Sequence, residues 1–428
     1  MQLNWAPSEG SQTLPRRSPP SKARRASTRL GIPLLLAGLA LAAGLAHDAR
    51  GATAEVAART TFFDEPSTNN TGVRVIHPQV DATATLASTV NLALGWSMDA
   101  VTGATPATFD TVSSATKFSD NRHLFHAAAG FERADSGISF GGGYAFESDY
   151  KSFVLSGTTH HDLHEHNFTL ALAYSHNFDS VCDADNTAAA GQPLNLVALG
   201  TSEGCFSNTP GIVTRKLSID TFEPSLSWTM TPRLVVQLGA TIQVLDGFQS
   251  NPYRKVLVGS QNRTPQEHLP EFRQRYAVFA RLAYALPELR ASTLAMIRGY
   301  DDSWHVRAFT ADVVGTKYLG QSMLLSLRAH YHVQGGASFY LDSVGYRVLG
   351  PPGQYWTGDR ELSPMGNYLL GGKLAFFRRP QQERSSWFVE MELGAKYELL
   401  LYRPESPFAP NADRTYAHIV QGAFATRF

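Results

Sequence analysis

The chain has 428 residues, with 37 basic side chains, 37 acidic side chains and two cysteines. This balance of charge gives no support to a nucleic-acid partner or a polybasic membrane-surface segment. A mean hydropathy of −0.19 argues against a polytopic helical membrane protein, and two cysteines cannot staple so long a chain. The 11% aromatic residues and 35 glycines, in a chain with little helix-friendly sequence, favour β structure.

The N-terminal segment has the organisation of a targeting signal. An apolar run of 16 residues, 31–46, is shorter than the ~20 residues that a membrane-spanning helix needs. Ala52, Thr53 and Ala54 then provide a small-x-small cleavage site. The basic residues before the apolar run are Arg16, Arg17, Lys22, Arg24, Arg25 and Arg29. We predict a cleaved secretory signal peptide over 1–54, with an uncleaved membrane anchor as the alternative.

Export has a consequence for the two cysteines. Disulfides persist in exported proteins, so we expect Cys182 and Cys205 to pair. A zinc site needs more ligands than two cysteines, and the sequence holds no CxxCH haem attachment. We therefore predict no cofactor.

Beyond residue 54 apolar and polar residues alternate, as in segments 167–175, 275–284, 322–332 and 387–398. A period of two with one apolar face indicates β-strands. The segments run for ~10 to 15 residues, whereas strands of soluble sheets usually have five or six. Aromatic residues also stand near the ends of the apolar faces, for example Tyr276 with Tyr284 and Trp387 with Tyr397. This placement is typical of the interfacial girdles of a transmembrane barrel.

These segments predict an all-β fold, an antiparallel up-and-down transmembrane β-barrel over 81–428. About 14 strands are expected, with 12 or 16 as alternatives. The predicted strands lie near 81–97, 121–133, 136–147, 151–159, 166–178, 217–230, 233–248, 273–286, 291–301, 304–317, 321–334, 365–378, 385–402 and 414–428. Residues 55–80, with their proline and asparagine content, are expected to form a periplasmic N-terminal extension that docks a partner or plugs the lumen.

The connections alternate between short and long. Short ones follow Arg133, Thr231, Leu286 and Leu319, and another lies around Arg379 and Pro380. The long ones include 98–120, 179–216, 249–272, 335–364 and 403–413. We expect the short turns in the periplasm and the long loops outside the cell, as in bacterial outer-membrane barrels.

The last strand ends at Phe428, with Phe424, Val420 and Tyr416 on the same face. Such a strand is what the barrel-assembly machinery of the outer membrane recognises. We therefore predict the outer membrane of a Gram-negative cell as the location, and its lipids and this machinery as partners.

Six segments in this order, 113–116, 147–150, 175–179, 250–258, 300–304 and 360–364, carry a resemblance. The set resembles an uncharacterised family of proteobacterial outer-membrane proteins, known as a domain of unknown function, over most of 80–428. The stretch 251–255 (Asn-Pro-Tyr-Arg-Lys) is its most specific part. The resemblance implies the barrel and its compartment, and supplies neither a substrate nor catalytic residues.

The alternation predicts a charged interior. The candidates for lining a pore are Arg281, Arg298, Arg328, Lys373, Glu390, Glu392 and Lys396, with Glu132, Glu223 and Glu398 on the same faces. Charges in a lumen need water or partners, so they imply either a wet channel or an ion-paired, filled barrel. Mixed signs argue against strong ion selectivity.

The extracellular loops offer binding candidates in Asn251, Tyr253, Arg254, Asp301 and Asp302. These residues could bind a solute or narrow the pore, since loops on rigid scaffolds often carry function. Their alternative role is to shape turns.

A histidine-rich turn supplies the candidate metal ligands His160, His161, His164 and His166. Neutral imidazole suits zinc, copper and nickel. The alternative is a solvated polar turn.

The sequence does not favour an enzyme. It contains no GxSxG, GxxxxGKS or HExxH motif. Ser175 and His176 are adjacent in a strand, so they point to opposite faces and cannot act together. The function predicted is a narrow passive channel for small solutes, with a non-conducting scaffold for periplasmic or surface partners as the alternative.

Overall fold

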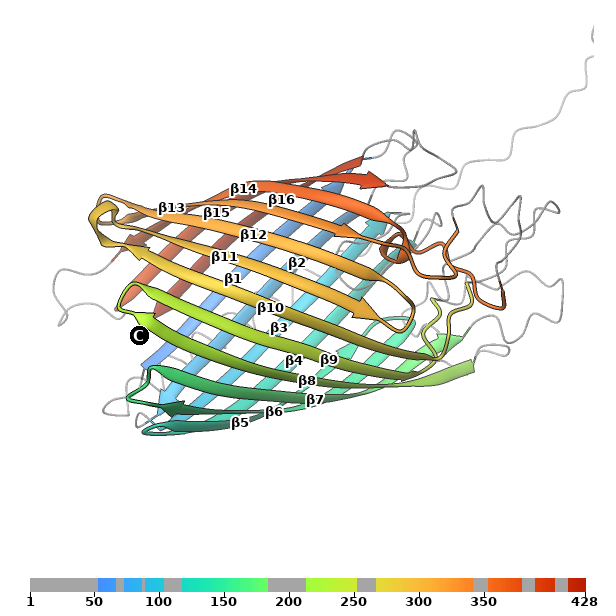
Figure 1. Ribbon diagram of the computed structural model, residues 1–428, viewed down its shortest axis with the longest axis horizontal. Helices are drawn as coiled ribbons and strands as arrows, with labels where there is room; N and C mark the ends of the chain where they lie inside the picture. Colours follow the sequence, from blue (N-terminus) through green and yellow to red (C-terminus); the bar gives the residue numbers. More distant parts are fainter. Residues whose placement is uncertain are drawn as a thin grey trace, which may run out of the picture.

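The computed structural model describes residues 53–66, 73–86, 89–103, 118–183, 213–251, 267–341, 353–378, 389–404 and 415–428. These residues form sixteen antiparallel strands in one closed barrel, in which each strand pairs with its neighbours in the chain and β1 pairs with β16 (Figure 1). The first eight are β1 (Thr53–Glu65), β2 (Val73–Leu86), β3 (Val90–Gly103), β4 (Phe118–Arg133), β5 (Ser136–Phe146), β6 (Tyr150–Leu163), β7 (Phe168–Asp183) and β8 (Val213–Thr231). The others are β9 (Leu234–Gly247), β10 (Phe272–Leu286), β11 (Ala291–Asp302), β12 (Arg307–Leu319), β13 (Met323–Gln334), β14 (Met365–Arg378), β15 (Glu390–Pro404) and β16 (Thr415–Arg427).

The closed antiparallel barrel is confirmed; it has sixteen strands, one of the two alternatives, and not the expected number of about 14. The described residues of 55–80, predicted as a periplasmic extension, lie in β1 and β2 apart from Pro66. The predicted strand 81–97 overlaps the end of β2 and the beginning of β3. Pro78 explains the error, because proline inside a strand removes one ladder hydrogen bond. The pairing of β2 with β3 passes from Ile76–Ala100 directly to Gln79–Ser97, whereas its pairing with β1 is continuous.

Each strand presents one apolar and one polar face. Large apolar side chains of one parity are exposed on the outer wall; they include Leu172, Leu238, Val278, Phe309, Leu327, Leu370, Leu393 and Val420. We call this outward set the apolar belt. Residues of the other parity face the lumen, as the strand register requires. Helical segments in the described part of the chain are the single 3-10 turns η3 (Pro287–Leu289) and η4 (Arg360–Leu362), and none has the length and apolarity to cross a membrane.

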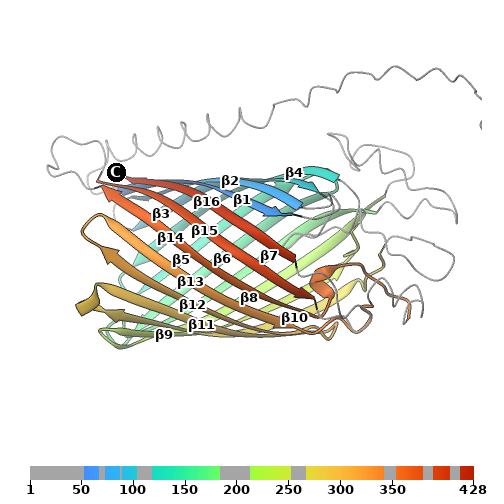
Figure 2. The same ribbon diagram turned by 90° about the horizontal axis from the view of Figure 1, so that it is seen from above.

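The two ends of the barrel differ. Short turns at 134–135, 164–167, 232–233, 287–290 and 320–322 lie at the end that also holds the C-terminus (Figure 1). We call this the turn end, and the opposite one the loop end. η4 lies at the loop end, as the view from above shows (Figure 2). The predicted short turns therefore lie together at one end of the barrel. The opposite end does not consist of long loops alone, since it also contains the short connections 147–149 and 303–306.

Deletion of residues 53–86 should prevent the barrel from closing, because it removes β1 and β2 and leaves β16 and β3 with unpaired edges. The measurement is heat-modifiable migration in electrophoresis after refolding in detergent. A chain beginning at residue 53 is the control and should give the compact form. A compact form of the deleted chain would contradict the assignment of 53–86 to the barrel wall.

Candidate functional site

A cavity of about 850 Å³ lies inside the loop end of the barrel. Its walls are inward residues of the strands, such as Asn177, Gln243, Arg298 and His332. Residues of four segments between strands, 248–251, 267–271, 303–306 and 353–364, also line it. A fifth segment, 335–341, packs against three of these four through Ala337 and Phe339. We call these five segments the roof.

The roof has its own apolar core. Six residues from four of its segments are buried against one another: Leu269, Trp304, Val306, Ala337, Phe339 and Leu362. Backbone hydrogen bonds join its segments, including a reciprocal pair between His268 and Trp356 (2.9 and 3.0 Å). Burying one large apolar side chain contributes about 1.5–3 kcal/mol, so this cluster holds the roof in a defined position over the lumen.

A buried ion pair anchors the turn between β11 and β12. Arg273 donates two hydrogen bonds to Asp302 Oδ2, and the Asp302 side chain is fully buried. The other carboxylate oxygen of Asp302 accepts from the backbone N–H groups of Trp304 and Val306, both at 2.9 Å. The Arg273 guanidinium lies 4.1 Å from the centre of the Trp304 ring. Asp302, a candidate loop residue, therefore has the alternative role expected for it, that of shaping the turn.

A second ion pair joins the roof to the first strand. Arg360 of η4 donates to both carboxylate oxygens of Glu65, at 2.8 and 3.2 Å, and lies 4.2 Å from the centre of the Tyr402 ring. Burial lowers the pKa of Arg360, but its hydrogen bond to Glu65 and the charge of Glu65 raise that pKa above its ordinary value. The guanidinium is thus permanently charged. Sequence reasoning did not single out this pair, because its members lie at distant positions in the chain.

The other predicted loop residues have different positions. The backbone N–H of Asn251 donates to the buried carboxylate of Glu267 (2.7 Å), which also accepts from the hydroxyl of Thr357. Asp301 is exposed on the outer face and pairs with Arg307 at 3.1 Å. Tyr253 and Arg254 lie outside the described residues. Of the three described residues of this set, Asn251 lines the cavity and Asp302 binds a roof segment, whereas Asp301 does neither.

Most of the predicted pore-lining charges are ion-paired along β12–β15. Arg328 pairs with Asp312 at 2.6 Å and with Glu398 at 3.2 Å, and Lys396 donates to the other oxygen of Glu398. Lys373 likewise pairs with Glu392 at 2.9 Å. His330 extends the network through its 2.9 Å contact with Asp312. This part of the wall is a chain of paired charges.

Gly371 makes that network possible. It lies on β14 between Arg328 of β13 and Glu398 of β15 in the register. A Cβ atom at Gly371 would stand 2.4 Å from Glu398 Cγ and 2.7 Å from the carbonyl oxygen of Tyr397. The absence of a side chain on the middle strand therefore lets side chains of the flanking strands meet.

The remaining pore-lining candidates have other surroundings. Arg281 donates to the Gln237 amide oxygen at 3.2 Å, and Arg298 lies 5.9 Å from the centre of the Tyr300 ring. Both are exposed although they face the lumen. Glu390 lies near the turn end, opposite Arg427 in the register.

The four histidines of the predicted metal site do not converge. His160 and His161 lie on opposite faces of β6: His160 approaches Glu132 at 3.3 Å, and His161 bonds the Ser136 hydroxyl. His166 binds Asp162 at 2.9 Å, and this hydrogen bond raises the pKa of His166. No group of three metal-ligating side chains occurs among the described residues. The metal prediction is therefore not supported, because strand alternation separates the imidazoles.

The structure describes one of the two cysteines of the predicted disulfide. Cys182 is fully buried near the loop end of β7 and is disulfide-bonded. Cys205, its expected partner, lies outside the described residues.

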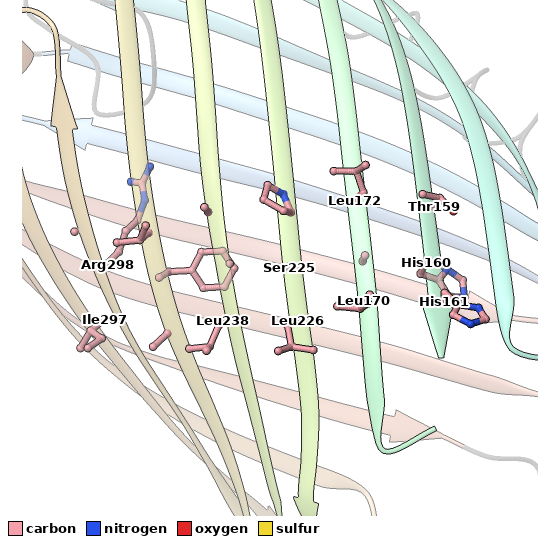
Figure 3. Close-up of a pocket in the computed structure, with 18 of the residues that line it drawn as sticks. Thr159, His160, His161, Leu170, Leu172, Ser225, Leu226, Leu238, Ile297 and Arg298 are labelled. Carbon is pink, nitrogen blue, oxygen red and sulfur yellow. The ribbon is translucent and has the colours of Figure 1, made fainter. Parts of the chain in front are cut away.

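An apolar pocket of about 830 Å³ lies against the wall formed by β6–β12. Figure 3 shows Leu170, Leu226, Leu238 and Ile297 in one row across this wall, on β7, β8, β9 and β11, with Leu172 further along β7. Because Leu172 and Leu238 belong to the exposed apolar belt, the pocket is a shallow part of the outer face. The more polar cavity beneath the roof is therefore the better candidate site.

Comparisons with known proteins identify a family. A family model described as "Protein of unknown function (DUF3570)" matches residues 34–377. No curated protein matches the sequence.

Solved structures with a similar shape are outer-membrane proteins. A bacterial polysaccharide outer membrane secretin is 10% identical, with coverage of 88% of this chain and 98% of that chain and a TM-score of 0.46. OpdK from Pseudomonas aeruginosa is 6% identical, with coverage of 89% and 100% and a TM-score of 0.38. OccAB3 from Acinetobacter baumannii is 8% identical, with coverage of 88% and 100% and a TM-score of 0.38. Likenesses this weak carry no argument about function.

Asp302→Asn should destabilise the turn between β11 and β12, because it leaves the buried charge of Arg273 without its anionic partner. Breaking a buried ion pair in this way costs about 3–5 kcal/mol. Limited proteolysis of the folded barrel, followed by mass spectrometry, should show new cleavage within 303–306. Asp301→Asn is the matched control, since Asp301 and Arg307 are exposed and an exposed pair contributes about 0–1 kcal/mol. Equal protease resistance of the two variants would contradict the anchoring role.

Gly371→Ala should destabilise the barrel by about 1–3 kcal/mol, since the new methyl group overlaps the backbone of β15. The measurement is the urea midpoint of unfolding in detergent micelles. Gly315→Ala on β12 is the control, because nothing lies within 4 Å of its added Cβ. Equal midpoints for both variants would show that β15 accommodates the added methyl group without loss of stability.

Proposed function

This chain belongs to the DUF3570 family of proteins of unknown function, and we propose from its architecture that it is a narrow passive channel for small solutes in the outer membrane of a Gram-negative bacterium. The observation that carries the proposal is a closed barrel with an apolar outer wall and a partly roofed polar lumen. The loop end would face the outside of the cell and the turn end the periplasm.

The outer wall supports the membrane location. Large apolar side chains such as Val278, Leu327, Leu370 and Leu393 are more than half exposed on it. An apolar surface of this extent on a monomer indicates contact with a partner or a membrane. A closed barrel is one of only two architectures that satisfy every backbone polar group within a bilayer.

The inner wall supports a path through the barrel. Along β5–β7 the inward residues are small: Ser139, Gly141, Ser156, Thr158, Ala171, Ala173 and Ser175. Small side chains cannot fill a lumen of this size, since barrels of 16 to 18 strands typically enclose an aqueous channel. The inward residues Thr158, Glu223, Arg281 and Arg298 are exposed, which fits a water-filled space.

The roof supports a narrow opening. Its segments connect β9 to β10, β11 to β12 and β13 to β14, and they reach β1 through Arg360 and Glu65. The cavity below it is large enough for a small solute, so the roof would act as a size filter.

The last strand would serve in assembly. Tyr416 and Val420 are exposed on the outer face of β16, and Phe424 faces Leu393 of β15. We propose that this apolar stripe, ending at Phe428, is presented to the barrel-assembly machinery and afterwards contacts membrane lipids.

One feature favours the second candidate, a non-conducting scaffold. The paired charges around Arg328 and Lys373 resemble an interior that is filled by its own ion pairs. This network occupies the β12–β15 wall, however, and the β5–β7 wall beside the lumen carries small residues. The channel therefore fits the described lumen better.

Strand β7 does not bring Ser175 and His176 together as a nucleophile and its base. Ser175 faces the lumen, whereas His176 lies on the outer face with its Nδ1 2.7 Å from Asp220. We propose that the protein is not an enzyme and that the His176–Asp220 pair is a local polar contact of the wall.

The test is single-channel recording of the refolded protein in a planar bilayer. We expect stable unitary conductance steps, and we expect Glu65→Gln to raise the conductance, because it removes the charge that holds η4 across the mouth. Asp301→Asn is the control, since its partner Arg307 lies on the outer face, and it should leave the conductance unchanged. A heat-modifiable barrel that never conducts would refute the channel and favour the scaffold.

A further inference from the structure

Three lumen-facing arginines form a line on two adjacent strands. Arg275 and Arg281 have the same parity on β10, and Arg298 of β11 pairs with Phe279 of β10. Arg298 therefore lies at a depth between the other two. With a rise of about 3.3 Å per residue, the steps along the strands are about 13 Å and 7 Å. We call Arg275, Arg298 and Arg281 the arginine line; it leads from the cavity under the roof toward the turn end.

The described partners of Arg281 and Arg298 are neutral, and Arg275 also donates to a neutral amide. Arg275 Nη1 donates to the amide oxygen of Gln243 at 3.0 Å, and Arg281 Nη1 donates to that of Gln237 at 3.2 Å. Arg281 lies 5.7 Å from the centre of the Phe279 ring, and Arg298 lies 5.9 Å from that of Tyr300. Within the described part of the chain, Arg281 and Arg298 have no carboxylate at ion-pair distance. A guanidinium has five N–H donors, so donors remain available on both.

The lumen-facing carboxylates of β12 and β15 named above as ion-paired are already bound to cations. Asp312 pairs with Arg328, Glu398 pairs with both Arg328 and Lys396, and Glu392 pairs with Lys373. Glu223 of β8 is the opposing charge: it is exposed in the lumen and accepts a hydrogen bond from the hydroxyl of Thr241 at 3.2 Å. The middle of the lumen beside β10 and β11 therefore carries a local excess of positive charge, although the chain as a whole is neutral.

We propose that the arginine line makes the lumen a path for small oxyanions, such as carboxylates or phosphate. The inference rests on the proposed channel and names its class of solute. The planar guanidinium fork matches the two oxygens of a carboxylate or phosphate. Several weak sites in sequence let an ion enter and still leave, which passive conduction requires. The mixed charges of the predicted lumen indicated no preference for anions, because the ion pairs that neutralise the acids form only in the folded barrel.

The test is the reversal potential in a planar bilayer under a KCl gradient. We expect a chloride-to-potassium permeability ratio of about three or more at low salt, where charges in the lumen are poorly screened. Arg281→Gln combined with Arg298→Gln should reduce the ratio to about one. Lysine at both positions should preserve it, because lysine keeps the charge. Arg307→Gln, which removes one charge from the outer face, is the control and should leave the ratio unchanged.

Glu223→Gln should change the chloride-to-potassium permeability ratio in the opposite direction. It removes the opposing carboxylate, so the preference for chloride should rise by about twofold. Phosphate or acetate added to the bath should reduce the chloride current of the unmodified protein, and this reduction should be weaker with both arginines replaced. Reduction by only one of the two anions would narrow the class to that anion.

The outcomes separate this inference from the channel itself. A pore that conducts with a ratio near one, unchanged by the arginine substitutions or by Glu223→Gln, overturns the oxyanion path and leaves the channel intact. A folded barrel without any conductance overturns both proposals.

Discussion

The ladder between β1 and β16 is the constraint on which the rest of the molecule depends. It runs from Glu55–Arg427 to Asp64–His418 and joins the first strand to the last. Without it the sheet would have two unpaired edges, and no bilayer could accommodate their backbone N–H and C=O groups. Closure also fixes the inside and the outside of every strand, since side chains alternate with a period of two. The apolar belt, the ion pairs and the arginine line all follow from this assignment.

Within the closed wall, missing side chains are as important as those present. Gly95, Gly137 and Gly371 each lie on a strand between two residues whose polar side chains approach one another. Across them Asp81 approaches His126 at 3.7 Å, Glu132 approaches His160 at 3.3 Å, and Arg328 binds Glu398. Inward charges are costly unless they are paired or hydrated. These gaps let partners two strands apart pair with one another, which leaves the centre of the lumen less obstructed.

Local sequence patterns predicted most of the wall and little of the roof. Alternation located thirteen of the strands, from β4 to β16, to within a few residues, because each strand carries its own period-two signal. It missed β1 and β2, where Pro66, Pro78 and the assumed signal cleavage site suggested an extension. Alternation also predicted that Arg281 and Arg328 face inward. Their different partners, Gln237 and Asp312, depend on the register between strands, which one strand does not encode. The His268–Trp356 and Arg360–Glu65 contacts join distant parts of the chain and leave no local signal.

The contact between Arg360 and Glu65 has a consequence for assembly. The two residues are 295 positions apart in the chain. η4 belongs to the connection between β13 and β14, and it reaches β1 only after β1 has come round to the last strands of the sheet. The segment that carries η4 therefore reaches its position at the mouth when β1 pairs with β16 and the wall closes. A barrel arrested before β1 pairs with β16 would have an open wall and would also lack the Arg360–Glu65 contact at its mouth. The pairing step that closes the wall would therefore also narrow the entrance.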